Sequence, residues 1–185
     1  MNHAMDNNPS KPAPPRINEP FRHRIPPEHM LPAAFCKYDD LTMRGEWKKA
    51  AEFCQELANQ PDSALELWQM IAFCRMYAEE YEQAEAAARY AIEREPGYGE
   101  AWYMLGCIQQ NMNALEEAVD SLSRSISLIP QNPLPWHELA IVYELMGNYE
   151  AALNALKQSI AVGKNPNRFQ RYLDYLQKLV RGEKP

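Results

Sequence analysis

The chain of 185 residues carries 19 basic and 25 acidic side chains, which gives a net charge of −6. An acidic chain without a basic stripe argues against binding of nucleic acid and against docking on an anionic membrane. No apolar run approaches the ~20 residues of a membrane-spanning helix, and the length suffices for one domain with a continuous core.

Residues 1–30 form the first predicted segment, an arm with seven prolines. Prolines at this density disfavour helix and strand, so we predict an extended or disordered arm. Apolar residues such as Ile17, Phe21 and Ile25 leave open that the arm docks along the rest of the chain or on a second copy. Because the arm lacks the apolar stretch of a signal peptide, we expect a cytoplasmic protein.

After the arm, a unit of constant length recurs. Trp68, Trp102 and Trp136 lie 34 residues apart, in copies that begin at Leu65, Gly99 and Pro133. A 34-residue period is typical of solenoids built from pairs of helices. Other positions that agree between the copies are 7 (Ile71, Leu105, Leu139), 8 (Ala72, Gly106, Ala140), 17 (Tyr81, Leu115, Tyr149), 20 (Ala84, Ala118, Ala152) and 28 (Ile92, Ile126, Ile160).

A weaker copy precedes these three and begins at Leu31, with Gly45 at its midpoint, Trp47 at position 17 and Ala50 at position 20. The predicted repeats are therefore 31–64, 65–98, 99–132 and 133–166. Small residues at positions 8 and 20 should face each other where the two helices of a repeat cross, and bulky residues at 4, 7, 17 and 28 should fill the remaining gaps. Gly45 and Gly147 should take left-handed conformations in the turns between helices.

The end of the chain, residues 167–185, is predicted to hold a capping helix. Asn165 and Pro166 have the residue types of a helix start, and Phe169, Tyr172 and Leu176 follow at helical spacing. An amphipathic helix at this place would seal the exposed end of the last repeat.

This pattern resembles the tetratricopeptide repeat (TPR) family, whose motif opens with W-x2-L-G-x2-Y. Trp102-x2-Leu105-Gly106 matches it directly, and Trp136-x2-Leu139-Ala140-x2-Tyr143 nearly matches it. The resemblance covers about residues 31–166. It implies an all-α fold, a right-handed TPR superhelix of about four helix-turn-helix repeats plus the C-terminal capping helix. Departures from the family pattern are Arg75, Gln109 and Lys164.

The resemblance also implies that the first helix of each repeat lines a concave groove. The predicted partner-binding residues are Glu66, Met70, Phe73, Tyr77, Glu100, Tyr103, Met104, Cys107, Leu134, His137, Glu138 and Ile141. This set has no Lys or Arg, so it excludes the clamp with which TPR co-chaperones hold acidic C-terminal tails. An apolar stripe on a helix can equally be core, and for Phe73 and Ile141 core and groove are equally favoured.

We therefore expect a protein-interaction module, an adaptor or chaperone that binds an apolar-rich peptide or helix, with or without a basic residue. In chemical character the groove is similar to that of bacterial TPR secretion chaperones. Replacing Tyr103 by Ala together with Met104 by Glu should weaken binding without unfolding the chain. Two alternatives stay open: a structural subunit or self-associating scaffold, including a homo-oligomer, and an arm that fills its own groove.

No pattern in the chain resembles an active site, so we expect no enzyme and no cofactor. The acid pairs Glu79-Glu80 and Glu116-Glu117 should be solvated helix starts. Cysteines 36, 54, 74 and 107 form no CxxC pair and have no metal-ligand spacing, and Cys54 and Cys74 occupy core-like positions. The four histidines are scattered, so we expect no metal site.

Overall fold

The computed structural model describes residues 32–60, 63–164 and 169–183. The chain divides into two compact units, residues 1–37 and residues 38–185. Of the first unit the structure describes residues 32–37, which open the first helix. The expectations on the arm, its extended conformation and its docking on the repeats, therefore lie outside the described residues.

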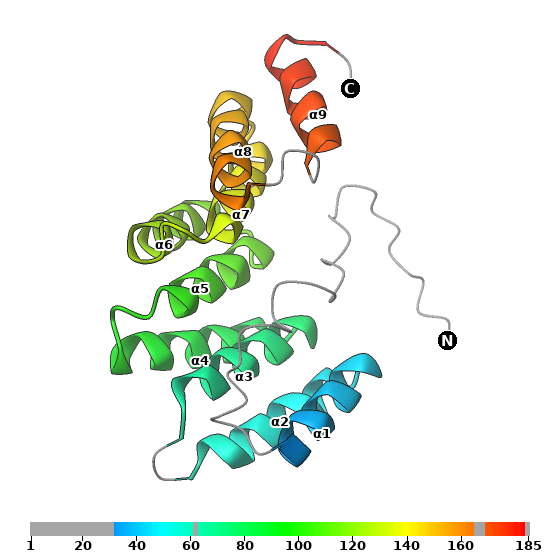
Figure 1. Cartoon of the computed structure of the whole chain (residues 1–185), viewed down its shortest axis with the longest axis vertical. Helices are drawn as coiled ribbons and strands as arrows, with labels where there is room; N and C mark the ends of the chain where they lie inside the picture. The colour runs from blue at the N-terminus through cyan, green and yellow to red at the C-terminus, as the bar shows by residue number, and fades with distance from the viewer. Residues whose placement is uncertain (1–31, 61–62, 165–168, 184–185) are drawn as a thin grey trace. The chain divides into compact units, whose positions relative to one another are not determined.

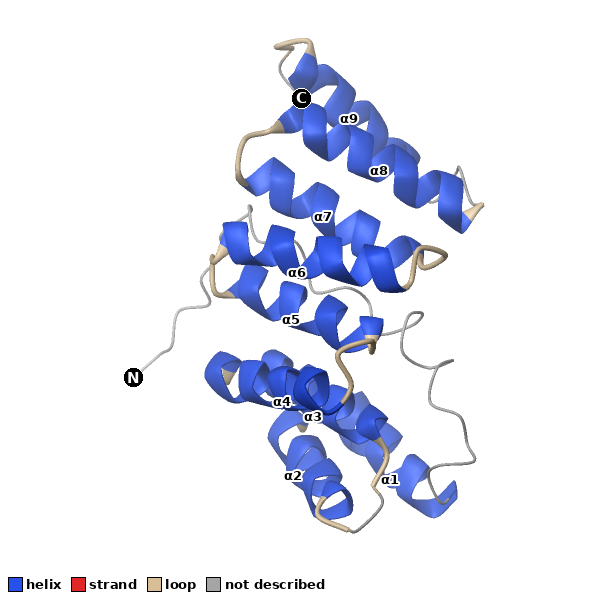
Figure 2. Cartoon of the chain, turned by 90° about the vertical axis from the view of Figure 1, so that its left-hand side faces the viewer, coloured by secondary structure: helices blue, strands red, loops and turns tan. Residues whose placement is uncertain are grey.

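Every regular element in the described ranges is a helix, and these ranges hold no strand (Figure 2). The helices are α1 (Pro32–Met43), α2 (Trp47–Ala58), α3 (Leu65–Tyr77), α4 (Tyr81–Arg94), α5 (Gly99–Asn111), α6 (Leu115–Leu128), α7 (Pro133–Leu145), α8 (Tyr149–Gly163) and α9 (Gln170–Val180). None of the described helices is both long and apolar enough to cross a membrane.

In the second unit, each helix from α2 onward packs against the next one along the chain, as Figure 1 shows. In addition, α3 packs against α5, and α5 packs against α7. The first helices of successive repeats thus form one layer, and the second helix of each repeat joins it to the following pair. This arrangement confirms the predicted all-α helical-repeat solenoid.

The predicted seam of small residues is present. Position 20 is completely buried in every copy, as Ala50, Ala84, Ala118 and Ala152. At position 8 of the third copy, a Cβ added to Gly106 would lie 2.6 Å from the Leu122 Cγ. The helices α5 and α6 therefore approach so closely that glycine is required at their crossing.

The turn inside each repeat has a left-handed residue at the same position, 15. Gly45 (φ 71°) and Gly147 (φ 75°) confirm the sequence prediction, and Glu79 (φ 60°) and Asn113 (φ 61°) adopt the same conformation without being glycine. At the Glu79 turn, the Glu80 N–H donates to the Arg75 carbonyl at 2.9 Å and the Glu79 N–H donates to the Met76 carbonyl at 3.0 Å. This is the Schellman pattern, which satisfies the last carbonyls of a helix.

The prediction that Glu79 and Glu80 are solvated helix starts holds for their place at the start of α4 and for the exposure of Glu79, but the Glu80 carboxylate is paired. Glu79 is the left-handed turn residue between α3 and α4, and Glu80 precedes the first residue of α4. The Glu80 carboxylate forms ion pairs with Arg75 and, at 2.8 Å, with Lys48. Its role is to link the α3–α4 turn to helix α2.

Two serines tie helix ends together within their repeats, a feature that the period alone does not reveal. The Ser125 hydroxyl donates to the Gly99 carbonyl at 2.8 Å, and the Ser159 hydroxyl donates to the Pro133 carbonyl at 2.8 Å. Both serines are buried. Each bond joins the last turns of a second helix to the start of its partner, so the two helices cannot slide along each other without breaking it.

The bulky positions are less uniform than predicted. Trp47, at position 17, stacks on Tyr77 of the following repeat with ring centroids 4.8 Å apart. Tyr149, at the same position of the last copy, is 36% exposed. The same position of the repeat therefore has different surroundings in the first and the last copy.

Helix α9 follows the last repeat and packs against α8. Leu176 is completely buried, whereas Arg171, Asp174 and Lys178 are exposed. The described helix begins at Gln170, and the predicted start at Asn165 and Pro166 lies outside the described residues. A capping role for α9 fits this division into a buried and a polar side, and it stays a prediction.

Candidate partner-binding face

The predicted partner-binding residues lie on α3, α5 and α7, the helices that pack side by side in the second unit. We call this set the first-helix face. Its members are Glu66, Met70, Phe73 and Tyr77 on α3, Glu100, Tyr103, Met104 and Cys107 on α5, and Leu134, His137, Glu138 and Ile141 on α7. The structure separates them into a buried and a partly exposed group.

The buried group contains most of the predicted apolar anchors. Its members and their exposed fractions are Met70 (4%), Phe73 (6%), Tyr103 (6%), Met104 (1%) and Cys107 (8%). A carboxylate placed at Met104 would be buried without a partner, which costs about 2 kcal/mol or more. The substitution Met104→Glu would therefore destabilise the fold, contrary to the expectation from the sequence.

The partly exposed group comprises Glu66, Tyr77, Glu100, Leu134, His137, Glu138 and Ile141. For Phe73 and Ile141 the sequence favours core and groove equally. In the structure Phe73 is buried and Ile141 is partly exposed. The partly exposed side chains therefore come mainly from α7, with Glu66 and Tyr77 from α3 and Glu100 from α5. The α5 residues Tyr103, Met104 and Cys107 lie deeper between them.

At the α3 end of the face, aromatic rings cluster around Tyr77. Phe73 lies 4.6 Å from it and Trp47 lies 4.8 Å from it, measured between ring centroids. Burial raises the pKa of Tyr77 to about 12, and the charges of Cys107 and Glu138 contribute further. Trp47 comes from α2, and its position 17 predicts only a gap-filling role, so sequence reasoning missed its place beside the face.

In the middle of the face, the charge of one carboxylate acts on groups of two other helices. Burial raises the pKa of Tyr103 and Cys107 well above their ordinary values, and the negative charge of Glu138 raises both further. The same charge contributes to the raised pKa of Tyr77. Glu138 of α7 therefore acts electrostatically on side chains of α3 and α5.

At the α9 end, aromatic residues complete the face. The His137 ring stacks on Phe169 with centroids 4.6 Å apart, and Tyr172 meets the same ring edge-on at 6.2 Å. The Tyr172 hydroxyl donates to a carboxylate oxygen of Glu144 at 2.6 Å. The sequence assigned Phe169 and Tyr172 to the capping helix alone, because nothing local to α9 indicates which repeat helix their rings reach.

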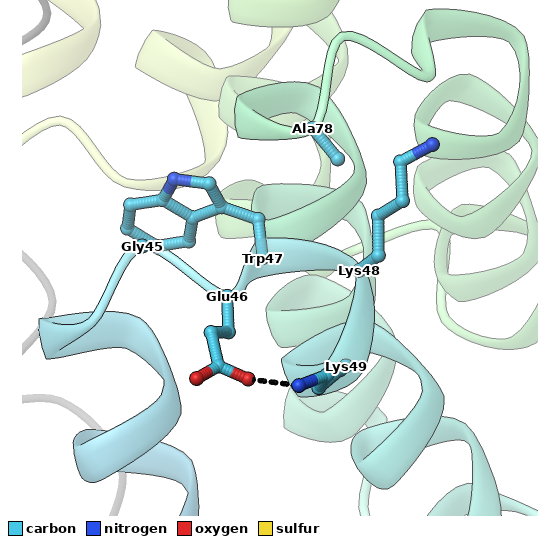
Figure 3. Close-up of a pocket in the computed structure, with 6 residues that line it drawn as sticks. All are labelled: Gly45, Glu46, Trp47, Lys48, Lys49 and Ala78. Atoms are coloured by element: carbon cyan, nitrogen blue, oxygen red, sulfur yellow. Dashed lines mark ion pairs between the residues drawn. The ribbon is translucent and has the colours of Figure 1, made fainter.

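A separate hollow lies at the turn between α1 and α2 (Figure 3). It is lined by Gly45, Glu46, Trp47, Lys48, Lys49 and Ala78. Its charges are already paired: Lys49 contacts Glu46 at 2.5 Å, and Lys48 contacts Glu80 at 2.8 Å. This hollow therefore offers no free charge to a ligand.

The cysteines and histidines form no metal-binding group within the described parts of the chain. Cys54 and Cys74 are completely buried, and Cys36 is exposed. Burial raises the pKa of the Cys74 thiol to about 12 and that of Cys54 further. The thiolate form of these two side chains is thus strongly disfavoured, as expected for cysteines of a core.

The pairwise helix packing and the shared face of α3, α5 and α7 define a paired-helix repeat solenoid. Two tetratricopeptide repeat family models match the chain, one over residues 75–133 and one over residues 136–168. The chain belongs to the tetratricopeptide repeat family. Proteins of this family are generally protein-interaction modules and generally non-catalytic.

Solved TPR structures share this fold. The structure of MamA matches with a TM-score of 0.61 and 18% identity, over 74% of this chain and 80% of that chain. The corresponding values for YrrB, described as "a TPR protein with an unusual peptide-binding site", are 0.60, 18%, 74% and 70%. For TTC0263, a thermophilic TPR protein of Thermus thermophilus, they are 0.67, 18%, 81% and 82%. No curated protein matches the sequence.

Proposed function

We propose that the chain is a non-catalytic adaptor or chaperone that holds an apolar-rich peptide or helix of a partner protein on the first-helix face. Two aromatic contacts beside the face carry this proposal: Tyr77 stacks on Trp47 with ring centroids 4.8 Å apart, and His137 stacks on Phe169 at 4.6 Å. Tyr77 and His137 are both partly exposed, so they offer aromatic surface to a ligand at the α3 and α7 sides of the face. Large aromatic side chains at such points supply most of the energy in protein interfaces.

The exposure pattern supports an apolar ligand. Leu134 and Ile141 of α7 are partly exposed beside His137, and Tyr77 of α3 is partly exposed on the other side of α5. Covering this apolar area would contribute roughly 25 cal/mol per Å². That YrrB is described as having a peptide-binding site supports a peptide as one form of the ligand.

Affinity purification of the full chain from native lysate would test this function. We expect the wild type to retain one stoichiometric partner, which a Leu134→Ala, Ile141→Ala variant loses while its circular dichroism spectrum is unchanged. A matched control is Met112→Ala, which removes apolar surface from the α5–α6 turn, where Met112 is 39% exposed. Retention of the same partner by the double variant would contradict the proposal.

A second candidate function is a self-associating scaffold, favoured by an apolar patch outside the first-helix face. Leu145 (48% exposed), Met146 (41%) and Tyr149 (36%) lie together at the α7–α8 turn. Contiguous exposed apolar residues often mark contact surfaces. Sedimentation equilibrium would detect an oligomer that a Leu145→Ser, Met146→Ser variant dissociates. A monomer at all concentrations would exclude this candidate.

A further inference from the structure

We propose that Glu138 forms a subsite of the first-helix face for a basic side chain, arginine or lysine, of the bound segment. This inference rests on the proposed function and adds to it the charge of the ligand. It commits the partner to a segment in which one cation is flanked by apolar residues. The argument rests on the surroundings of the Glu138 carboxylate.

The Glu138 carboxylate is mostly removed from water, and no Lys or Arg of the described residues forms an ion pair with it. Its side chain is 17% exposed, and among the described residues its partner within hydrogen-bonding distance is the His137 Nδ1, at 3.4 Å. That separation exceeds the 2.7–2.9 Å of a strong charge-assisted bond. A carboxylate in such a place is stabilised by a cation that brings its own hydrogen-bond donors.

Two basic side chains of the first two repeats are engaged elsewhere. Arg75 and Lys48 form ion pairs with Glu80, at the α3–α4 turn. The first-helix face itself contains no lysine or arginine. Among the described residues no Lys or Arg forms an ion pair with Glu138, so a basic side chain of the ligand would supply the complementary charge.

Aromatic rings beside His137, the neighbour of Glu138 in the chain, favour the same chemistry. The His137 ring stacks on Phe169 at 4.6 Å and meets Tyr172 edge-on at 6.2 Å, and all three side chains are partly exposed. Cations bind over the faces of tyrosine rings, and arginine also stacks on them. Glu144, which accepts the Tyr172 hydroxyl at 2.6 Å, adds a second negative charge to this side of the face.

The flanking contacts determine the rest of the ligand. Leu134 and Ile141 lie on α7, the helix of Glu138, and both are partly exposed. A small inorganic cation would leave these apolar side chains uncovered, and no group of three His, Cys, Asp or Glu residues suited to a metal occurs in the described chain. A peptide cation uses both the carboxylate and the apolar neighbours.

Selection of a random displayed peptide library on the full chain would test the inference. We expect the enriched peptides to carry Arg or Lys at one fixed place between apolar residues. Selection on Glu138→Gln should keep the apolar preference and lose the basic one. The matched control Glu150→Gln removes an exposed carboxylate from the first turn of α8, and it should leave the selected peptides unchanged.

One enriched arginine peptide should then be synthesised in two forms, with arginine and with its neutral isostere citrulline. Citrulline should weaken binding to the wild type by about 10- to 100-fold, the range of a hydrogen bond to a charged group. It should not weaken binding to Glu138→Gln further, because the interaction is already absent. The citrulline comparison needs no variant protein, so it decides the question even if the variant folds poorly.

The outcomes separate the two proposals. Enrichment of apolar peptides without a basic preference, or equal binding of arginine and citrulline peptides, would overturn the Glu138 subsite and leave the proposed function standing. Enrichment of no peptide at all would overturn the proposed function, and the subsite with it.

Discussion

The substitution Gly106→Ala, at the crossing of α5 and α6, should change the free energy of unfolding in opposite directions when residue 122 is leucine and when it is alanine. A Cβ at Gly106 would lie 2.6 Å and 2.9 Å from the Leu122 Cγ and Cδ2 atoms, and 3.4 Å from the Ala118 carbonyl oxygen. Leu122 is completely buried, so it cannot move away into solvent. The substitution Gly106→Ala should therefore overpack the crossing.

Two opposing contributions determine the effect of Gly106→Ala on the free energy of unfolding. Overpacking costs about 1–3 kcal/mol, whereas alanine is favoured over glycine inside a helix by about 0.5–1 kcal/mol. We expect Gly106→Ala to lower the free energy of unfolding by about 1 kcal/mol. Leu122→Ala alone should lower it by about 2–5 kcal/mol because it leaves a cavity. In the Leu122→Ala background the close contacts vanish, so Gly106→Ala should raise the free energy of unfolding by about 0.5–1 kcal/mol.

Urea denaturation of the wild type and the three variants, followed by circular dichroism, would measure these free energies. The control is Ala140→Gly at position 8 of the next repeat, where alanine is completely buried. Ala140→Gly should lower the free energy of unfolding by the same amount whether residue 122 is leucine or alanine, because positions 140 and 122 lie at different helix crossings. Stabilisation of the wild type by Gly106→Ala, or an effect of one sign in both backgrounds, would refute the packing argument.

Three further outcomes follow from particular contacts. Glu79→Gly should raise the free energy of unfolding by about 0.5–1 kcal/mol in urea denaturation, because glycine adopts the left-handed conformation of this exposed turn without strain; a lower value would contradict the strain. Ion pairs lower the pKa of Glu80 below its ordinary 4.5, so they stabilise the fold above that pH and lose this effect as the pH falls. Glu80→Gln should therefore be less stable than the wild type at neutral pH and equally stable in acid, and a constant difference across this range would exclude the ion pairs as its cause. Of the four cysteines, exposed Cys36 should react rapidly with a disulfide reagent in the native chain, and the other three should react only after denaturation. Rapid reaction of all four in the native chain would show that the core opens.

Much of the architecture follows from the sequence because the repeat is a local property. The tryptophan period, the alanines of position 20 and the glycines of two turns repeat at fixed spacing, and each copy meets the same neighbours as the last. Trp68, Trp102 and Trp136 lie on α3, α5 and α7, which pack side by side as the first helices of successive repeats. The same regularity could not show that Glu79 and Asn113 adopt the left-handed conformation, because the turn imposes it on whichever residue stands there.

The first-helix face needed the tertiary structure. Position in the repeat shows which side of a helix a residue occupies, but exposure depends on the distance between neighbouring helices and on the side chains across the gap. Met70, Tyr103 and Met104 are buried for that reason, although they occupy the same side of their helices as the partly exposed Leu134 and Glu138. The surroundings of Glu138 depend on contacts between α3, α5, α7 and α9, which are distant in sequence. The period itself determined the solenoid, and side-chain packing between its repeats decided which residues a partner can reach.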